Sequence, residues 1–183
     1  MENVPGCTRD SGRVEGARGA LKEHFECGGE TRGASVFNGL LAMRDVIDGN
    51  DWVLVHDAVR PCLPGEVLER LITTLRDDET GGLLALPMVD TLKRGDADAH
   101  VVQTEPREHL WQAQTPQMFR YRLLVEALRA IGPAHATDEA RALEHLGLRP
   151  KLVMGDRRNL KITYPQDLAL AALVLKLLET GFA

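Results

Sequence analysis

The sequence predicts an α/β fold in which helices cover both faces of a largely parallel, doubly wound sheet. Short apolar runs, typical of strands buried on both faces, alternate with amphipathic segments at helical spacing. Clusters of Gly, Pro, Asn and Asp separate these segments. The chain has 183 residues, of which 44% are hydrophobic, and this is enough for one well-filled domain.

The first predicted strand covers Trp52–Val55 and ends in a compact polar cluster formed by His56, Asp57 and Arg60. Its unbroken apolar run predicts a central strand. Ligands of open α/β sheets bind at the carboxyl ends of strands, where an acid and an arginine suit a metal ion and an anionic group. In the simpler alternatives, Asp57 caps the next turn and pairs with Arg60, and His56 is a hydrogen-bonded spacer.

The segments on either side of this strand keep the alternation. Ser35 is the predicted N-cap of a helix whose apolar residues recur between 36 and 46. A second amphipathic helix is predicted over 66–76, and a second buried strand over 83–88. Helix and strand therefore follow each other as in a doubly wound sheet.

Residues 89–115 interrupt this rhythm. Short alternating segments predict strands at 91–93, 100–104 and 110–112, separated by turn residues. These segments carry too little apolar mass for a second core. The insertion is therefore predicted either to pack on a partner subunit as an arm or to fold over its own sheet.

Regular structure returns after the insertion. An amphipathic helix is predicted over 121–131, and Thr137–Glu139 supply an N-cap and first-turn acids for another. Strands are predicted at 151–154 and 160–162. A capping box at Thr163–Gln166 then predicts the start of a final helix that carries the leucines of 168–178.

The composition excludes several classes of function. The net charge is −5 and no basic block is present, so nucleic-acid binding is not expected. No apolar run approaches the ~18 residues of a membrane span, and the N-terminus lacks the apolar core of a signal peptide. Cys7, Cys27 and Cys62 are odd in number and scattered, which argues against a disulfide framework or a zinc site. A reducing cytoplasm is the expected location.

Residues 1–27 differ from the rest and are predicted to form an irregular leader, because they are rich in Gly, Arg and Glu and show little periodicity. Residues 28–183 are predicted to form the domain itself, with the insertion at 89–115 as its arm.

Polar residues gather at the predicted strand ends. If the carboxyl ends share one edge, Asp57, Thr91 and Lys161 converge there. A carboxylate, cations and hydroxyls suit a phosphate ester bound beside Mg²⁺. Lys161 lies between two apolar residues, and a buried ammonium is costly unless an anion meets it. Further members of this polar set are Arg60, Lys93, Arg107, Thr115 and Thr137.

Six blocks of the sequence, taken in order, resemble the 2-C-methyl-D-erythritol 4-phosphate cytidylyltransferases, the CTP-using enzymes of the non-mevalonate isoprenoid pathway. The resemblance implies a Rossmann-like nucleotidyltransferase sheet with a protruding β-arm that embraces a second subunit, and hence a homodimer. The blocks are GGETRGASVFNGL (28–40), HDAVRP (56–61), PMVDTLKR (87–94), PREHLWQAQTPQMF (106–119), ATDEARALEHLG (136–147) and NLKITYPQDLALA (159–171).

The resemblance also implies roles for individual residues. Asp57 would bind Mg²⁺ near the reacting phosphates, Arg60 would position that acid or the substrate, and Lys161 would stabilise charge on the α-phosphorus of CTP. The methylerythritol phosphate would meet Thr91, Arg107, Thr115 and Thr137, with Arg107 acting across the dimer. Gly29, Arg32 and Ser35 would lie near the cytidine.

The chain departs from the family pattern at its beginning. The family starts with a buried strand and a glycine-rich loop that cradles the triphosphate, and residues 1–27 match neither. The sequence is therefore expected to be an N-terminally truncated member with low CTP turnover. The alternatives are a ribitol-phosphate cytidylyltransferase and a non-catalytic remnant that only dimerises or binds substrate phosphate.

Overall fold

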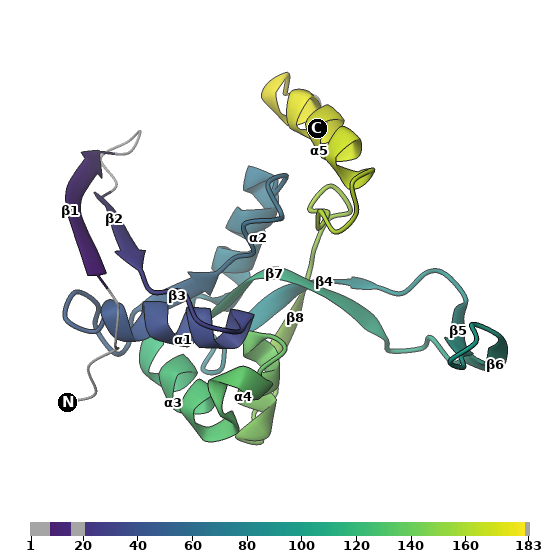
Figure 1. The fold of residues 1–183 in the computed structure, drawn as a ribbon, viewed down its shortest axis with the longest axis horizontal. Helices are drawn as coiled ribbons and strands as arrows, with labels where there is room; N and C mark the ends of the chain where they lie inside the picture. Colours follow the sequence, from purple (N-terminus) through teal and green to yellow (C-terminus); the bar gives the residue numbers. More distant parts are fainter. Residues whose placement is uncertain (1–7, 16–20, 182–183) are drawn as a thin grey trace. The chain divides into compact units, whose positions relative to one another are not determined.

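The computed structural model describes residues 8–15 and 21–181 (Figure 1). In its first half, the elements are β1 (Thr8–Glu15), β2 (Leu21–Glu26), α1 (Arg32–Ala42), β3 (Trp52–Val55), α2 (Gly65–Leu75), β4 (Gly82–Pro87) and β5 (Leu92–Gly95). The second half comprises β6 (Val101–Glu105), β7 (Trp111–Arg120), α3 (Tyr121–Ile131), the 3₁₀ helix η1 (Pro133–His135), α4 (Glu139–His145), β8 (Lys151–Met154) and α5 (Asp167–Glu179).

A four-stranded sheet has the order β3-β7-β4-β8. β3 runs antiparallel to β7, with Trp52 opposite Arg120 and Val55 opposite Gln117. β4 and β8 run in the same direction, because the Lys151 N–H donates to the Gly81 carbonyl and the Gly155 N–H to that of Ala85. The sheet is mixed, whereas the sequence predicted a largely parallel one. The strand after the arm returns as the long β7, and this produces the antiparallel pairing.

β3 lies at one edge of this sheet, so the prediction of a central strand is wrong for the described strands. Leu54 is 36% exposed and only Val53 within the strand is buried. An apolar run of four residues does not distinguish an edge strand from a central one, because both need one face covered.

The chain divides into two compact units. The first contains the described residues up to Val55 together with 78–82 and 117–151. Within it, α3 packs on α4 and on α1. Its buried side chains include Leu40, Phe119, Leu124, Leu128 and Leu143.

The second unit contains residues 56–77, 83–116 and the described residues from 152. Its buried apolar side chains include those of Cys62, Val67, Leu71, Leu84 and Val153. The predicted hairpin is present: β5 pairs antiparallel with β6. Figure 1 shows this hairpin at the tip of an extension formed by the ends of β4 and β7.

Several predicted helix starts lie elsewhere. α1 begins at Arg32, with Thr31 as N-cap accepting from the Ala34 N–H, so Ser35 lies inside the helix. The N-cap of α4 is Asp138, not Thr137. Residues 160–162 form no strand in the described structure. The predicted capping box does not form, since α5 starts at Asp167 with Gln166 as N-cap and no side-chain capping bond.

Asp167 takes over the capping of the segment before α5. Its carboxylate accepts hydrogen bonds from the backbone N–H groups of Thr163 and Tyr164, at 2.9 and 2.8 Å. These bonds hold the pKa of the Asp167 carboxyl below its ordinary value. The backbone N–H groups before α5 are therefore capped by Asp167, an acid in the first turn, and not by the Thr and Gln side chains of the predicted capping box.

β1 and β2 form an antiparallel pair in which Thr8 lies opposite Glu26 and Leu21 opposite Glu15. The sequence predicted an irregular leader over 1–27, so the structure is more regular there than expected. Backbone hydrogen bonds join such a pair without requiring an apolar pattern. The remaining leader positions, 1–7 and 16–20, lie outside the described residues.

None of the helices in the described ranges is long and apolar enough to cross a membrane. Cys62 is a buried free thiol whose pKa is raised by burial, whereas Cys27 takes part in a disulfide bond. The disulfide differs from the expectation of unpaired cysteines, on which the predicted reducing compartment partly rests.

Candidate active site

The Asp57 carboxylate lies between two cations in the loop that follows β3. Its Oδ2 is 3.6 Å from Nζ of Lys161 and 3.8 Å from Nε of Arg60. The side chains of Asp57 and Arg60 are 11% and 9% exposed, and that of Lys161 is 47% exposed. Two positive charges around one carboxylate leave a local excess of positive charge, which favours an anionic ligand such as a phosphate.

A hydrogen-bond chain fixes the backbone around Asp57. The Asp57 N–H donates to Oγ1 of Thr115, at 3.0 Å. Oγ1 of Thr115 lies 3.0 Å from Nδ1 of His56, and His56 Nε2 lies 2.9 Å from the Arg60 carbonyl. A carbonyl only accepts, so Nε2 carries a proton, and in the tautomer with a bare Nδ1 that nitrogen accepts from the Thr115 hydroxyl. His56 is therefore a hydrogen-bonded spacer in this loop.

Asn159 ties the loop before α5 to the rest of the second unit. Its Nδ2 donates to the Thr115 carbonyl at 2.7 Å, and its own carbonyl accepts from Nη1 of Arg60 at 2.8 Å. The side chain is fully buried, and its Oδ1 has no hydrogen-bond partner in the part of the chain that the structure describes. Lys161 follows two residues later. The anchored Asn159 therefore fixes the position of the backbone from which the Lys161 side chain extends.

Gln114 provides a second tie to the same loop. Its Nε2 donates to the carbonyl of Asp156 at 2.9 Å, and its Oε1 accepts from the Asp156 N–H at 3.3 Å. Gln114 and Asn159 were not among the site residues predicted from the sequence. The sequence did contain one sign of Gln114. It lies in a strand, Trp111–Arg120, that is largely buried and yet carries polar residues at positions expected to be apolar.

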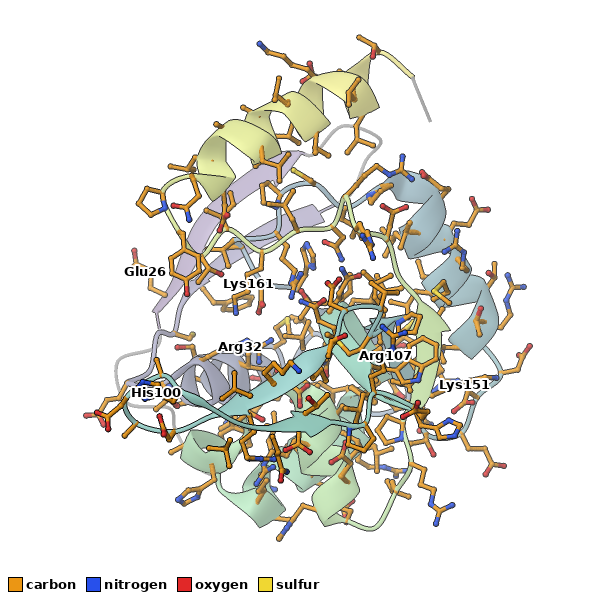
Figure 2. All side chains as sticks on the ribbon, turned by 90° about the vertical axis from the view of Figure 1, so that its right-hand side faces the viewer. Glu26, Arg32, His100, Arg107, Lys151 and Lys161 are labelled. Atoms are coloured by element: carbon orange, nitrogen blue, oxygen red, sulfur yellow. The ribbon has the colours of Figure 1, made fainter. Side chains whose placement is uncertain are left out.

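A cavity of about 500 Å³ adjoins this cluster. Arg60, Lys161 and Arg157 bring cations to its wall, while Asp90 and Asp167 bring acids. Figure 2 shows Lys161 in the segment that leads to α5. Apolar lining comes from Leu86, Pro87, Met88, Leu160 and Leu170.

A second cavity, of about 470 Å³, lies at the base of the hairpin, where Arg107 is labelled in Figure 2. Thr91 and Arg107 both line it. Nη1 of Arg107 donates to the Val89 carbonyl, which ties the end of β6 back to the start of the arm. Lys93 donates from Nζ to Oγ1 of Thr104 at 2.7 Å, within the hairpin.

Comparisons with known proteins decide the family. The sequence profile of 2-C-methyl-D-erythritol 4-phosphate cytidylyltransferase matches residues 15–177. The chain belongs to this cytidylyltransferase family.

Two relatives that bear this name come from Nitrosospira multiformis and Nitrosomonas eutropha. They are 62% and 59% identical over 154 residues, which is 83% of this chain and 66% of each relative. A solved 4-diphosphocytidyl-2C-methyl-D-erythritol synthase superposes with a TM-score of 0.75 at 47% identity, covering 81% of this chain and 69% of that one. The chain thus spans about two thirds of the length of these cytidylyltransferase relatives.

The structure groups the predicted cytidylyltransferase residues in three places. Asp57, Arg60, Thr115 and Lys161 form one cluster in the second unit, connected by the contacts above. Thr91 and Arg107 line the cavity at the arm. The residues predicted for the cytidine, Gly29, Arg32 and Ser35, lie in the first unit together with Thr137.

Lys161 differs from its prediction in one respect. Its side chain is 47% exposed, and its neighbours Leu160 and Ile162 are only partly buried. The expected cost of a buried ammonium is therefore absent, because residues 160–162 form a loop and not a buried strand. An exposed ammonium can leave Asp57 and reach a phosphate.

The residues predicted for the cytidine make contacts within their own unit. Oγ of Ser35 accepts from the Gly29 N–H at 2.9 Å and lies 3.0 Å from the Thr31 carbonyl, to which it can donate. Arg32 donates from both Nη atoms to the Glu139 carboxylate, at 2.7 and 3.0 Å. Ser35 therefore closes the turn onto α1, and Arg32 joins α1 to α4.

The predicted magnesium site has one carboxylate. Among the described residues, no group of three or more His, Cys, Asp or Glu side chains could hold a metal ion. Mg²⁺ is commonly held by one or two carboxylates plus substrate phosphates, and Asp57 fits that arrangement. It does not fit an all-protein cage.

Proposed function

We propose that this protein transfers CMP from CTP to 2-C-methyl-D-erythritol 4-phosphate and releases pyrophosphate, a step of the non-mevalonate isoprenoid pathway. The carrying observation is the Asp57 carboxylate held between Arg60 and Lys161 beside a cavity of about 500 Å³. Family membership and the names of the relatives support the choice of substrates.

In the proposed reaction, an oxygen of the polyol phosphate attacks the α-phosphorus of CTP. A phosphorus–oxygen bond forms on one side as the bond to the departing pyrophosphate breaks on the other. Lys161 meets the negative charge on the α-phosphate, and Arg60 holds Asp57 in place. The attacking oxygen is already anionic, so positioning and charge neutralisation suffice without a protein nucleophile.

Magnesium belongs to the same proposal. Asp57 would hold the ion together with phosphate oxygens of the nucleotide. When bound, Mg²⁺ neutralises charge on the transferring phosphates.

The polyol phosphate is proposed to meet four residues, of which Thr115 lies against Asp57. Gly29 and Ser35 are proposed near the cytidine. Arg32 is engaged by the buried Glu139 carboxylate, which argues against its predicted nucleotide contact. The four proposed polyol-phosphate residues are Thr91, Arg107, Thr115 and Thr137.

A homodimer formed through the β5–β6 hairpin is proposed as the working state, with Arg107 acting on the partner's substrate. Val101 and Val102 on the hairpin are 64% and 60% exposed, which suits burial against a second copy. Light scattering should report a dimer for the wild type and a monomer for Val101→Lys/Val102→Lys. A wild-type monomer at micromolar concentration would contradict this part.

A cytoplasmic location is the final part of the proposal. Both proposed substrates are phosphorylated metabolites that do not cross membranes unaided. In the structure Cys27 takes part in a disulfide bond, which a reducing cytoplasm would reduce to a thiol. Thiol counting on protein purified under non-reducing conditions, together with cell fractionation, tests this point.

The decisive experiment measures pyrophosphate release with CTP and Mg²⁺, using methylerythritol phosphate and ribitol 5-phosphate side by side. The proposal expects turnover with the first substrate and at least tenfold lower kcat/KM with the second. The reverse preference would favour the ribitol-phosphate enzyme. Binding of methylerythritol phosphate without any turnover would favour the non-catalytic remnant.

A further inference from the structure

The first turn of α1 contacts the segment that carries Thr137 on both sides of that residue. On one side, a Cβ at Gly33 would lie 2.1 Å from the Pro133 carbonyl oxygen and 3.1 Å from that of Ala136. On the other side, Arg32 binds Glu139. Because Gly33 has no side chain, α1 can lie close to the backbone of residues 133–136, and this places Arg32 against α4.

The ion pair between Arg32 and Glu139 joins a buried carboxylate to a partly exposed guanidinium. The Glu139 side chain is 1% exposed and that of Arg32 is 33% exposed. Both guanidinium Nη atoms reach the carboxylate, at 2.7 and 3.0 Å, in the bidentate geometry that arginine favours. A carboxylate so far from water needs such a partner, so Arg32 is structurally committed to α4.

Gln117 holds the same turn from β7. Its Oε1 accepts from the Ala140 N–H at 2.8 Å, and its Nε2 donates to Oδ2 of Asp138 at 3.0 Å. The other oxygen of Asp138 caps α4 by accepting from the Arg141 N–H at 2.9 Å. Residues on either side of Thr137 are thus fixed. Thr137 itself is exposed, and its hydroxyl has no partner among the residues that the structure describes.

We propose that Arg32 and Glu139 are positioning residues for Thr137, and that Arg32 therefore serves the polyol phosphate and not the nucleotide. This inference rests on the proposed function. A free hydroxyl on a firmly held backbone is preorganised to donate to a phosphate oxygen. The Arg32–Glu139 pair fixes the position of the Thr137 hydroxyl by holding the first turn of α4, and it does not contact the ligand itself.

Calorimetric titration of the whole protein separates the two roles. Methylerythritol phosphate and CTP with Mg²⁺ are each titrated into the wild type, Arg32→Gln, Glu139→Gln and the double variant. Each single variant should raise the Kd for the polyol phosphate about tenfold and leave the Kd for CTP within twofold. The double variant should lose no more than either single variant, because both remove one shared contact.

Arg141→Gln is the matched control, since it removes an exposed arginine of α4 and should change neither Kd. Arg32→Lys keeps the charge and loses the bidentate geometry, so it serves if the glutamine variants fail to fold. A Kd for CTP that rises in Arg32→Gln while the polyol phosphate is unaffected would overturn the inference. So would two unchanged Kd values in a folded variant.

The methyl resonance of Thr137, followed by NMR without ligand, gives an independent readout. Arg32→Lys and Glu139→Gln should shift it, whereas Arg141→Gln should not. If the wild type binds neither ligand, the proposed function fails, and this resonance still decides whether the pair positions Thr137. An unshifted resonance in both variants would refute the positioning role.

Discussion

Lys161 places its Nζ 3.6 Å from Oδ2 of Asp57, and the two side chains differ in freedom: the acid is 11% exposed and the lysine 47%. The acid is held by its surroundings, including the bond from its own N–H to Thr115. The lysine reaches it from a loop open to solvent. The pair is therefore suited to an exchange in which the ammonium leaves the carboxylate for a phosphate.

Lys161→Ala should lower kcat for CMP transfer by at least ~100-fold, because it removes a charge that stabilises the transition state. The midpoint of thermal unfolding should change little, since half of the side chain is in water. Steady-state kinetics and a thermal melt provide the two measurements. Lys176→Ala, in the last turn of α5, is the control and should retain full turnover. Full turnover by Lys161→Ala would remove the assigned role.

Asn159→Ala should reduce both stability and turnover. The substitution leaves the Thr115 carbonyl without the bond from Nδ2 and opens a gap in a fully buried site. The expected loss is about 1–3 kcal/mol in the free energy of unfolding. Urea denaturation measures it. Asn50→Ala replaces an exposed asparagine and should stay within ~0.5 kcal/mol of the wild type.

Asp156 should make the stability depend on pH in the acid range. Hydrogen bonds from the Arg158 side chain hold the pKa of the Asp156 carboxyl below its ordinary value. Because the folded pKa is the lower one, this stabilisation is complete above the unfolded pKa of ~3.9 and is lost as the pH falls through the folded value.

Asp156→Asn should therefore be less stable than the wild type at pH 7, and the difference should shrink below about pH 4. Urea titrations at pH 7, 5 and 3 measure it. Asp77→Asn replaces an exposed acid and is the matched control. A difference between Asp156→Asn and the wild type that grew toward low pH would contradict the assigned sign.

Two glycine substitutions should have opposite effects on stability. Gly81 has a φ of +93°, and a Cβ there would lie 2.3 Å from the Met118 carbonyl oxygen. Gly81→Ala should cost more than about 1 kcal/mol. Gly39 lies inside α1, and a Cβ added there would meet nothing within 4 Å outside the backbone of its own helix, so Gly39→Ala should add about 0.5–1 kcal/mol. Thermal melts of the two variants test the contrast, and a Gly81→Ala as stable as the wild type would contradict it.

Local patterns predicted many of the elements. The amphipathic spacing of residues 66–76 and 121–131 corresponds to α2 and α3, and the short segments after 89 form the hairpin. The starts of α1, α4 and α5 were missed. The starts of α1 and α4 depend on which of several neighbouring capping side chains reaches a free N–H. The N-cap of α5 makes no side-chain capping bond, so a capping pattern in the sequence does not mark its start.

Some residues of the candidate site could be predicted from the sequence, and others could not. The polar residues after β3 marked Asp57 and Arg60, because a charged pair directly behind an apolar run is conspicuous. Gln117 and Glu139 gave no such signal: their importance comes from burial and from partners elsewhere in the chain. The spacing of residues along the sequence does not show which distant residues lie close together in the fold.

The sequence by itself determined the α/β alternation, the arm at 89–115 and, through six ordered blocks, the family resemblance. These are local or additive properties, in which each segment contributes its own pattern. Only the tertiary structure decided the antiparallel pairing of β3 with β7, the exposure of Lys161 and the commitment of Arg32 to Glu139. Those outcomes depend on which distant groups share a desolvated space, and that is settled when the chain packs.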